Sequence, residues 1–208
     1  MAYFPMFIDL NQKKCLIVGG GSVALRKVHM FQEFGAKIQV IAPDIIEELQ
    51  QTEGIELIYR RFETSDLQDV DIVVAATDSV TVNQEIAKLC KEQHIPVNVV
   101  NAPETGSFVC PAYSKSGDVV AAFSSGGKSP VIPQYLKRQI VPIMSEFLAE
   151  QTAYLGSVRE MVKFQVTDKR RRKQVYEKLF ELSEEKGRLP LQEEFEKIVA
   201  EVIDDTCK

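Results

Sequence analysis

Three observations predict an α/β fold whose first half contains a parallel sheet. Short apolar runs alternate with helical patterns up to about residue 100, as they do where parallel strands are joined by right-handed crossovers. A triple-glycine turn lies between the first strand and the first helix. Near residue 101 the alternation ends, and a hairpin pattern followed by helical patterns takes its place.

The apolar runs predict five strands, at residues 14–18, 38–42, 55–59, 71–77 and 97–100. Apolar residues recur at the helical period over 22–34 and 80–92, and Pro43 opens a short helix. The fourth run is uninterrupted, which favours a strand covered on both faces. The first hundred residues therefore predict a doubly wound sheet.

The second half begins with a different pattern. Residues 107–113 and 118–124 predict the two strands of a hairpin, joined by a turn at 114–117. Ser129 is predicted as a helix N-cap with Pro130 at the first helical position. The rest of the chain is expected to be helical.

Composition excludes several classes of protein. The chain has 208 residues, 45% of them hydrophobic, so it can bury a core. Its net charge of -5 means that nucleic-acid binding would need a local basic patch. Only one such patch is present, near residue 170, and we expect no nucleic-acid binding. No apolar stretch approaches the roughly 18 residues of a membrane span, and no secretion signal is recognisable, so a cytoplasmic protein without a membrane partner is expected.

Cysteine and histidine are too scattered to predict a metal centre. They lack the close spacing of zinc ligands and stand at Cys15, Cys90, Cys110, Cys207, His29 and His94. The thiols are expected to be reduced and to act as small apolar residues.

The turn after the first strand predicts a Rossmann-type dinucleotide site. Residues 19–24 read Gly-Gly-Gly-Ser-Val-Ala and fit the pattern G-x-G-x-x-A. Gly19 allows the sharp turn and Gly21 the close approach of a pyrophosphate, which the amides and dipole of the next helix would hold. A purely structural turn is the alternative, but the position between a strand and a helix favours binding.

Two further strand ends contribute candidate cofactor residues. Asp44 follows the second strand, where a carboxylate would bind the ribose hydroxyls and repel a 2′-phosphate, so NAD is favoured over NADP. Asp44 beginning a helix is the alternative. Thr77 and Asp78 end the fourth strand, at the sheet edge where ligands bind.

Several segments resemble, in the same order, the precorrin-2 dehydrogenase module at the N-terminal end of siroheme synthases. They are Tyr3-Phe4-Pro5-Met6-Phe7, 15–26, Ala75-Ala76-Thr77-Asp78, Val82-Asn83, 97–103, 124–130 and Arg170-Arg171-Arg172. The Asn-Val-Val and Ser-Ser-Gly-Gly-x-Ser-Pro stretches are much more specific than the glycine pattern. No methyltransferase segment follows them, so the stand-alone form of the module is expected.

The resemblance implies NAD-dependent oxidation of precorrin-2 to sirohydrochlorin by a homodimer. It implies a Rossmann domain at 1–112, a dimerisation region at 113–145 that crosses between subunits, and a helical domain at 146–208. It also implies that Ser22, Val23, Pro43 and Asp44 line the dinucleotide.

Asn101 is a departure from bifunctional relatives, which carry aspartate at this position. An amide is a poor base near neutral pH, but it can hold a substrate by hydrogen bonds. We therefore expect no efficient iron chelatase activity, and Glu104 is the nearest carboxylate that would substitute. A bifunctional dehydrogenase and ferrochelatase is the alternative, as is a structural role for Asn101 in capping the loop.

The remaining candidates would meet the substrate. The loop with Ser124, Ser125, Gly126 and Lys128 resembles the active-site loop of the family, and Ser125 joins Asn101 and Glu104 as a catalytic candidate. Arg171 lies in a basic run that would attract the eight carboxylates of precorrin-2, although a solvated helix face is the alternative.

Two other functions remain open. A regulatory dinucleotide sensor would explain the Rossmann half but not residues 97–130. A dehydrogenase for another small substrate is compatible with the fold alone.

Overall fold

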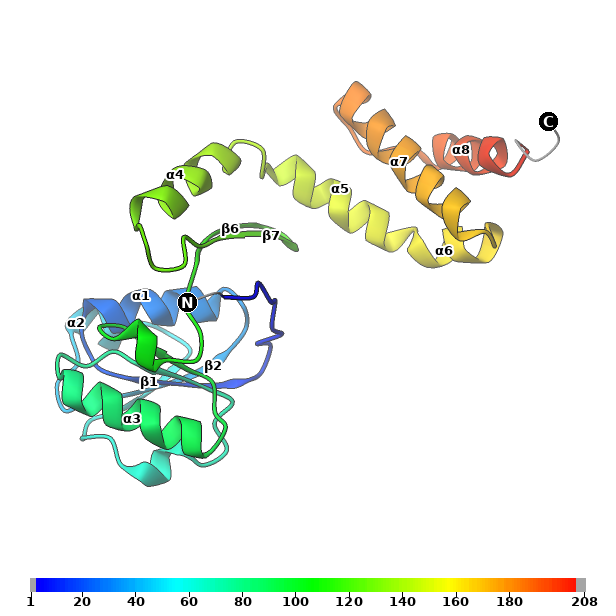
Figure 1. Ribbon diagram of the computed structural model, residues 1–208. Coiled ribbons are helices and arrows are strands. Elements are labelled where there is room, and N and C mark those ends of the chain that lie inside the picture. The colour runs from blue at the N-terminus through cyan, green and yellow to red at the C-terminus, as the bar shows by residue number, and fades with distance from the viewer. Residues whose placement is uncertain (1–2, 205–208) are drawn as a thin grey trace. The chain divides into compact units, whose positions relative to one another are not determined.

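The computed structural model describes residues 3–204, which divide into two compact units, 3–110 and 111–204. The first unit contains the α/β half of the chain, and the second contains a hairpin and helices (Figure 1). Among the described residues, none of the helices is long and apolar enough to cross a membrane.

The first unit is built on a five-stranded sheet with the order β3-β2-β1-β4-β5, and all of its strand pairs are parallel. The strands are β1 (Lys14–Val18), β2 (Lys37–Ile41), β3 (Ile55–Ile58), β4 (Ile72–Ala75) and β5 (Val97–Val99). Strand β1 lies in the middle and pairs with both β2 and β4. From β1 the chain first adds strands on one side of the sheet and then, from β4 on, adds them on the other side. This reversal creates the crevice at the carboxyl ends of the strands where open sheets bind ligands. The predicted Rossmann-type sheet is confirmed.

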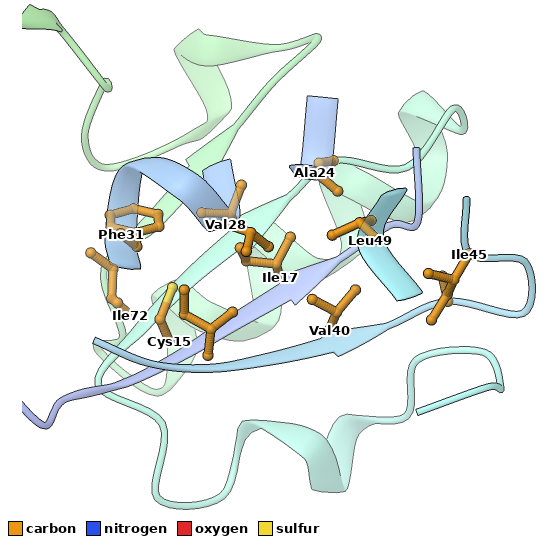
Figure 2. Packing of buried hydrophobic residues seen from close by; sticks show 13 residues of the cluster. Cys15, Ile17, Ala24, Val28, Phe31, Val40, Ile45, Leu49 and Ile72 are labelled. Carbon is orange, nitrogen blue, oxygen red and sulfur yellow. The ribbon is translucent and has the colours of Figure 1, made fainter. Parts of the chain in front are cut away.

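Both faces of the sheet are covered. On one face, α1 (Ser22–Gln32) and α2 (Glu47–Gln50) pack on residues such as Ile17 and Val40 (Figure 2). On the other face, α3 (Val80–Glu92) packs on the alternate strand residues. Central strands without a polar face are expected in such a sheet, because successive side chains point to opposite sides.

The predicted bounds of the five strands and of α1 agree with the structure to within two residues, and α3 matches its predicted range. The short helix does not open at Pro43, because α2 begins at Glu47 with Ile46 as its N-cap, and Pro43 and Asp44 lie in the loop before it. Two short 3-10 turns were not predicted, η1 (Thr64–Leu67) and η2 (Pro103–Thr105).

The hairpin is confirmed, but its first strand and its turn were misplaced. It consists of β6 (Ala112–Ser116) and β7 (Val119–Phe123), antiparallel and joined through Gly117 and Asp118. Residues 107–108 belong to the sheet unit instead. The Ser107 N–H donates to the Val97 carbonyl at 2.8 Å, and the Asn98 side chain donates to the Phe108 carbonyl at 3.0 Å. These bonds keep the segment beside β5.

The helices of the second unit follow the hairpin. They are α4 (Val131–Ile140), α5 (Glu146–Ser157), α6 (Arg159–Gln165), α7 (Lys169–Lys186) and α8 (Gln192–Asp204). Helix α4 begins one residue later than predicted, at Val131, and Pro130 rather than Ser129 is its N-cap. The Ser129 hydroxyl nevertheless accepts from the Val131 and Ile132 N–H groups. A separate apolar core joins α6, α7 and α8, with Leu179 and Phe195 fully enclosed.

A cluster of charges closes the turn between α7 and α8. The Glu194 carboxylate accepts two bonds from Arg188, both at 2.9 Å, one from the Leu191 N–H at 2.8 Å, and another from Lys186. Arg188 makes the largest contribution to holding the pKa of Glu194 well below its usual range, followed by Lys186. The charged form of Glu194 therefore stabilises this turn.

The change Glu194→Gln is expected to lower the thermal midpoint of unfolding at pH 7, measured by circular dichroism of the helices. Because the folded pKa of Glu194 is depressed, its contribution is complete above the unfolded pKa of about 4.3 and is lost as pH falls below it. The difference from the wild type should therefore shrink as the pH falls below about 4.3. Glu193→Gln is the matched control and should change little; equal effects of both variants would contradict the assignment.

Candidate functional site

Gly19 and Gly20 bring three strand ends together. Gly19 has a φ of +133°, and a Cβ built on it would lie 2.3 Å from the Ala76 carbonyl oxygen. A Cβ on Gly20 would lie 2.0 Å from the Asp44 carbonyl oxygen. Any side chain at either position would push away the loop after β4 or the loop after β2. These two glycines are therefore required by the fold itself.

Gly21 is different, because a Cβ built on it would meet no atom of the chain within 4 Å. It has a φ of -95° and is the N-cap of α1, so its backbone does not require glycine. The first amides of α1 point away from the helix without intrahelical acceptors, and the first turn has no acidic residue. A small residue beside a helix N-terminus leaves room for a phosphate to approach these amides.

A cavity of about 650 Å³ lies at this edge of the sheet. Its lining includes the predicted cofactor residues Gly19, Pro43, Asp44, Thr77 and Asp78. The predicted residues Gly21, Ser22 and Val23 do not line it; they continue the chain directly after Gly20, which does. The cavity thus joins the ends of β1, β2 and β4.

Asp44 is exposed beside the exposed Pro43 in the loop between β2 and α2. Within residues 3–204, no group donates a hydrogen bond to the Asp44 carboxylate. A carboxylate without a protein donor at the lining of a cavity retains its acceptors for the hydroxyl groups of a ligand.

The segment 61–64, which follows β3, also lines the cavity and was not identified from the sequence. The guanidinium of Arg60 holds this segment by binding both oxygens of Asp66, at 2.5 and 2.8 Å. Asp66 also accepts from the Glu63 N–H at 2.8 Å, and Arg60 is the main cause of its lowered pKa. The rule that ligands bind at the carboxyl ends of strands would have pointed to this segment.

Asn83 links the ends of β4 and β5. Its Oδ1 accepts from the Thr77 N–H at 3.1 Å and from the Thr77 hydroxyl at 2.7 Å. Its Nδ2 donates to the Thr77 carbonyl and to Asn101 Oδ1, both at 2.9 Å. Asn83 is fully buried, whereas Asn101 is exposed. Asn83 belongs to one of the segments that resemble precorrin-2 dehydrogenases, but the sequence predicted no role for it.

Glu104 is exposed in η2, the turn that follows Asn101. The Thr105 hydroxyl closes this turn on the Ala102 carbonyl at 2.7 Å. The chain therefore brings Asn101 and Glu104 to the carboxyl end of β5.

The serine loop lies in the second unit, between β7 and α4. The Ser125 hydroxyl donates to the Ser129 carbonyl at 2.6 Å and accepts from the Ser129 N–H at 3.0 Å, so it closes the loop on itself. Ser124 is exposed, and its hydroxyl accepts from the Gly126 N–H at 3.1 Å. Lys128 is exposed as well.

Arg171 lies in the first turn of α7. The Asp168 carboxylate caps that turn by accepting from the Arg170 and Arg171 N–H groups at 2.8 and 3.0 Å. The Arg171 guanidinium donates to the Ile203 carbonyl at 3.5 Å. The basic run thus sits at a positive helix end, which strengthens its attraction for anions.

The described cysteines are free, as predicted. Burial raises the pKa of the Cys90 thiol to about 11, so it is neutral at physiological pH. Cys207 lies outside the described residues. Within residues 3–204, no group of three or more His, Cys, Asp or Glu side chains is placed to hold a metal ion.

Comparison with known proteins identifies relatives among the siroheme synthases. The siroheme synthases of Nitrosospira multiformis and Thioalkalivibrio sulfidiphilus are 36% and 35% identical to the chain over 189 and 184 residues. These alignments cover 87% of this chain but only 40% and 38% of the two relatives, so the chain spans about 40% of their length. The similarity to siroheme synthases that the sequence motifs predicted is confirmed.

The fold has a solved counterpart in a precorrin-2 dehydrogenase, SirC. The two share 22% identity with a TM-score of 0.71, over 97% of this chain and 100% of the other. A family model described as "Putative NAD(P)-binding" matches residues 6–112, the part of the chain that holds the sheet and the glycine turn. The chain therefore belongs to this NAD(P)-binding family.

Proposed function

We propose that the chain is an NAD-dependent precorrin-2 dehydrogenase, a cytoplasmic homodimer that oxidises precorrin-2 to sirohydrochlorin. The observation that carries this proposal is the cavity at the carboxyl edge of the sheet, with Gly21 open beside it, in a chain similar to siroheme synthases over most of its length. The names of those relatives and of the solved precorrin-2 dehydrogenase supply the substrate.

The residues at the sheet edge fit a dinucleotide. The space beside Gly21 and the first amides of α1 suit a pyrophosphate, and the carboxylate of Asp44 suits a ribose that carries a free 2′-hydroxyl. That carboxylate would repel a 2′-phosphate, so the site favours NAD over NADP. Thr77 and Asp78 would line the cofactor further along the edge, toward β5.

The reaction removes one hydride and one proton from the macrocycle, and bound NAD supplies the hydride acceptor. The protein has to hold the macrocycle beside the cofactor and provide a route for the proton. Glu104 offers a carboxylate for that proton near Asn101. Ser124 and Lys128 would bind substrate carboxylates, and Ser125 would hold their loop in shape.

Cations in the second unit would recruit the substrate. Precorrin-2 carries eight carboxylates, and a protein with a net charge of -5 needs a local positive region to attract it. The run that contains Arg171 supplies such a region at the start of α7. Because the amide of Asn101 is a weaker metal ligand than a carboxylate, we also propose that iron insertion is inefficient.

The homodimer is supported by an exposed apolar face on α4. Four of its residues have large exposed fractions: Val131 63%, Ile132 53%, Tyr135 50% and Leu136 39%. Apolar residues clustered on one helix face favour burial against another protein surface. A second copy of this chain is the proposed occupant, within the predicted dimerisation region 113–145.

The change Gly21→Val should weaken NAD binding at least about tenfold, equal to about 1.4 kcal/mol, because its side chain would fill the space for the pyrophosphate. The thermal midpoint should stay near that of the wild type, since no protein atom is displaced. Calorimetric titration with NAD measures the first effect, and thermal unfolding measures the second.

Two other glycines provide the controls for this experiment. Gly156→Val, in α5, also meets no atom within 4 Å and should leave NAD affinity unchanged. Gly20→Ala should instead destabilise the fold. Undiminished NAD binding by Gly21→Val would show that the pyrophosphate does not lie there.

Purified protein with NAD should convert anaerobically prepared precorrin-2 to sirohydrochlorin, with an equal amount of NADH formed. Absorbance reports both products. NAD binding without turnover would instead identify a dinucleotide sensor, and turnover of another small substrate alone would identify a different dehydrogenase.

The change Ile132→Glu should convert the dimer to a monomer, because an unpaired charge would enter an apolar interface. Light scattering coupled to gel filtration measures the mass. Gln93→Glu adds the same charge at an exposed residue outside 113–145 and is the control for surface charge. A wild-type monomer at micromolar concentration would contradict the dimer.

A further inference from the structure

The buried amide of Asn83 makes all the hydrogen bonds that an amide can make. Both acceptor sites of Oδ1 are occupied by Thr77 donors, and both hydrogens of Nδ2 are donated, one to the Thr77 carbonyl and one to Asn101. Since Asn83 is fully buried, each lost bond would leave a polar atom without water.

The backbone of Thr77 decides which way the Asn83 amide points. The Thr77 N–H can only donate, so Oδ1 of Asn83 must face it. The Thr77 carbonyl can only accept, so Nδ2 of Asn83 must face the carbonyl. The amide orientation therefore follows from two groups whose roles cannot be exchanged.

The orientation of Asn83 in turn determines that of Asn101. The second hydrogen of Asn83 Nδ2 needs an acceptor at 2.9 Å, and Asn101 can offer only Oδ1. Its Nδ2 must then point away from Asn83. In the described part of the chain, the Asn101 N–H groups have no acceptor, and the residue is exposed.

We propose that Asn83 is a positioning residue that holds the Asn101 amide with its oxygen inward, so that the Asn101 N–H groups bind a carboxylate oxygen of the substrate. The identity of the substrate rests on the proposed function. Asn101 does not line the cofactor cavity, but it is tied through Asn83 to Thr77, which does. A ligand bound at Asn101 would therefore lie close to the cofactor at this edge of the sheet.

This orientation gives Asn101 a role that aspartate could not fill. A carboxylate at position 101 would still accept the bond from Asn83, so the wall of the site would remain intact. It would, however, present a negative charge to an anionic macrocycle in place of two donors. The structure thus makes Asn101 a substrate donor and gives no support to its use as a base.

The test compares Asn101→Ala and Asn101→Asp in their affinity for sirohydrochlorin, which retains the carboxylates of the substrate and is not turned over. Absorbance titration in metal-free buffer should show that affinity for sirohydrochlorin decreases from the wild type to Asn101→Ala and again to Asn101→Asp. The alanine variant should bind about tenfold more weakly, and the aspartate variant more weakly still. NAD affinity should be unchanged in both. Asn11→Asp, at another exposed asparagine, is the matched control.

Aspartate binding as tightly as asparagine would show that oxygen faces the ligand and would overturn the proposal, as would equal affinities of all variants. A wild-type protein that binds NAD but no sirohydrochlorin would instead refute the proposed substrate. Side-chain amide resonances from ¹⁵N-labelled protein test the orientation alone. The Asn83 NH₂ hydrogens should exchange slowly with solvent and those of Asn101 fast, and the reverse would overturn the proposal.

A double-mutant cycle tests whether Asn83 acts through Asn101. Asn83→Asp should weaken sirohydrochlorin binding in the wild-type background and have no further effect in the Asn101→Ala background. Equal losses in both backgrounds would assign Asn83 a general structural role. If Asn83→Asp does not fold, the Asn101 series and the amide exchange still decide the question.

Discussion

Three strand ends approach one another closely around Gly19 and Gly20, and without this approach the sheet edge and its cavity could not form. Backbone atoms after β2 and β4 occupy the positions where side chains of these two residues would begin. Only hydrogen side chains let these loops close against the end of β1, and this closure creates the cavity at the edge of the sheet. Gly21, one residue later, is free of that constraint, because a Cβ there would meet no atom of the chain within 4 Å.

Polar side chains then shape the cavity that the glycines make possible. The Arg60–Asp66 pair holds the segment after β3 at one side, and Asn83 joins the ends of β4 and β5 at the other. In our proposal both contacts act indirectly, because a residue that does not meet the ligand holds neighbouring residues that do. Such supporting contacts allow a site to hold its geometry without large movements.

The second unit has a different physical basis. It has its own apolar core among α6, α7 and α8, and its charged residues cap or clamp helix ends, as Asp168 and Glu194 do. The serine loop is also held by a side-chain contact, because the Ser125 hydroxyl bonds to the backbone of Ser129. Ser124 in the same loop is exposed. Our proposal uses the exposed serine and lysine side chains of this loop to bind a large anion.

The sheet was predictable from local sequence, because runs such as 72–76 are apolar at every position, as expected of a strand buried on both faces. Local patterns also predicted the glycine turn and placed Asp44 and the end of β4 at the ligand-binding edge of the sheet. The hairpin register was not predictable in this way, because residues 107–108 bond to Val97 and Asn98, which no local pattern reveals. Only the tertiary structure assigned the segment 61–64 to the cavity and joined Asn83 to Asn101, 18 positions apart in sequence. Contacts of this kind depend on which strands become neighbours, and that is decided by the packing of the whole sheet.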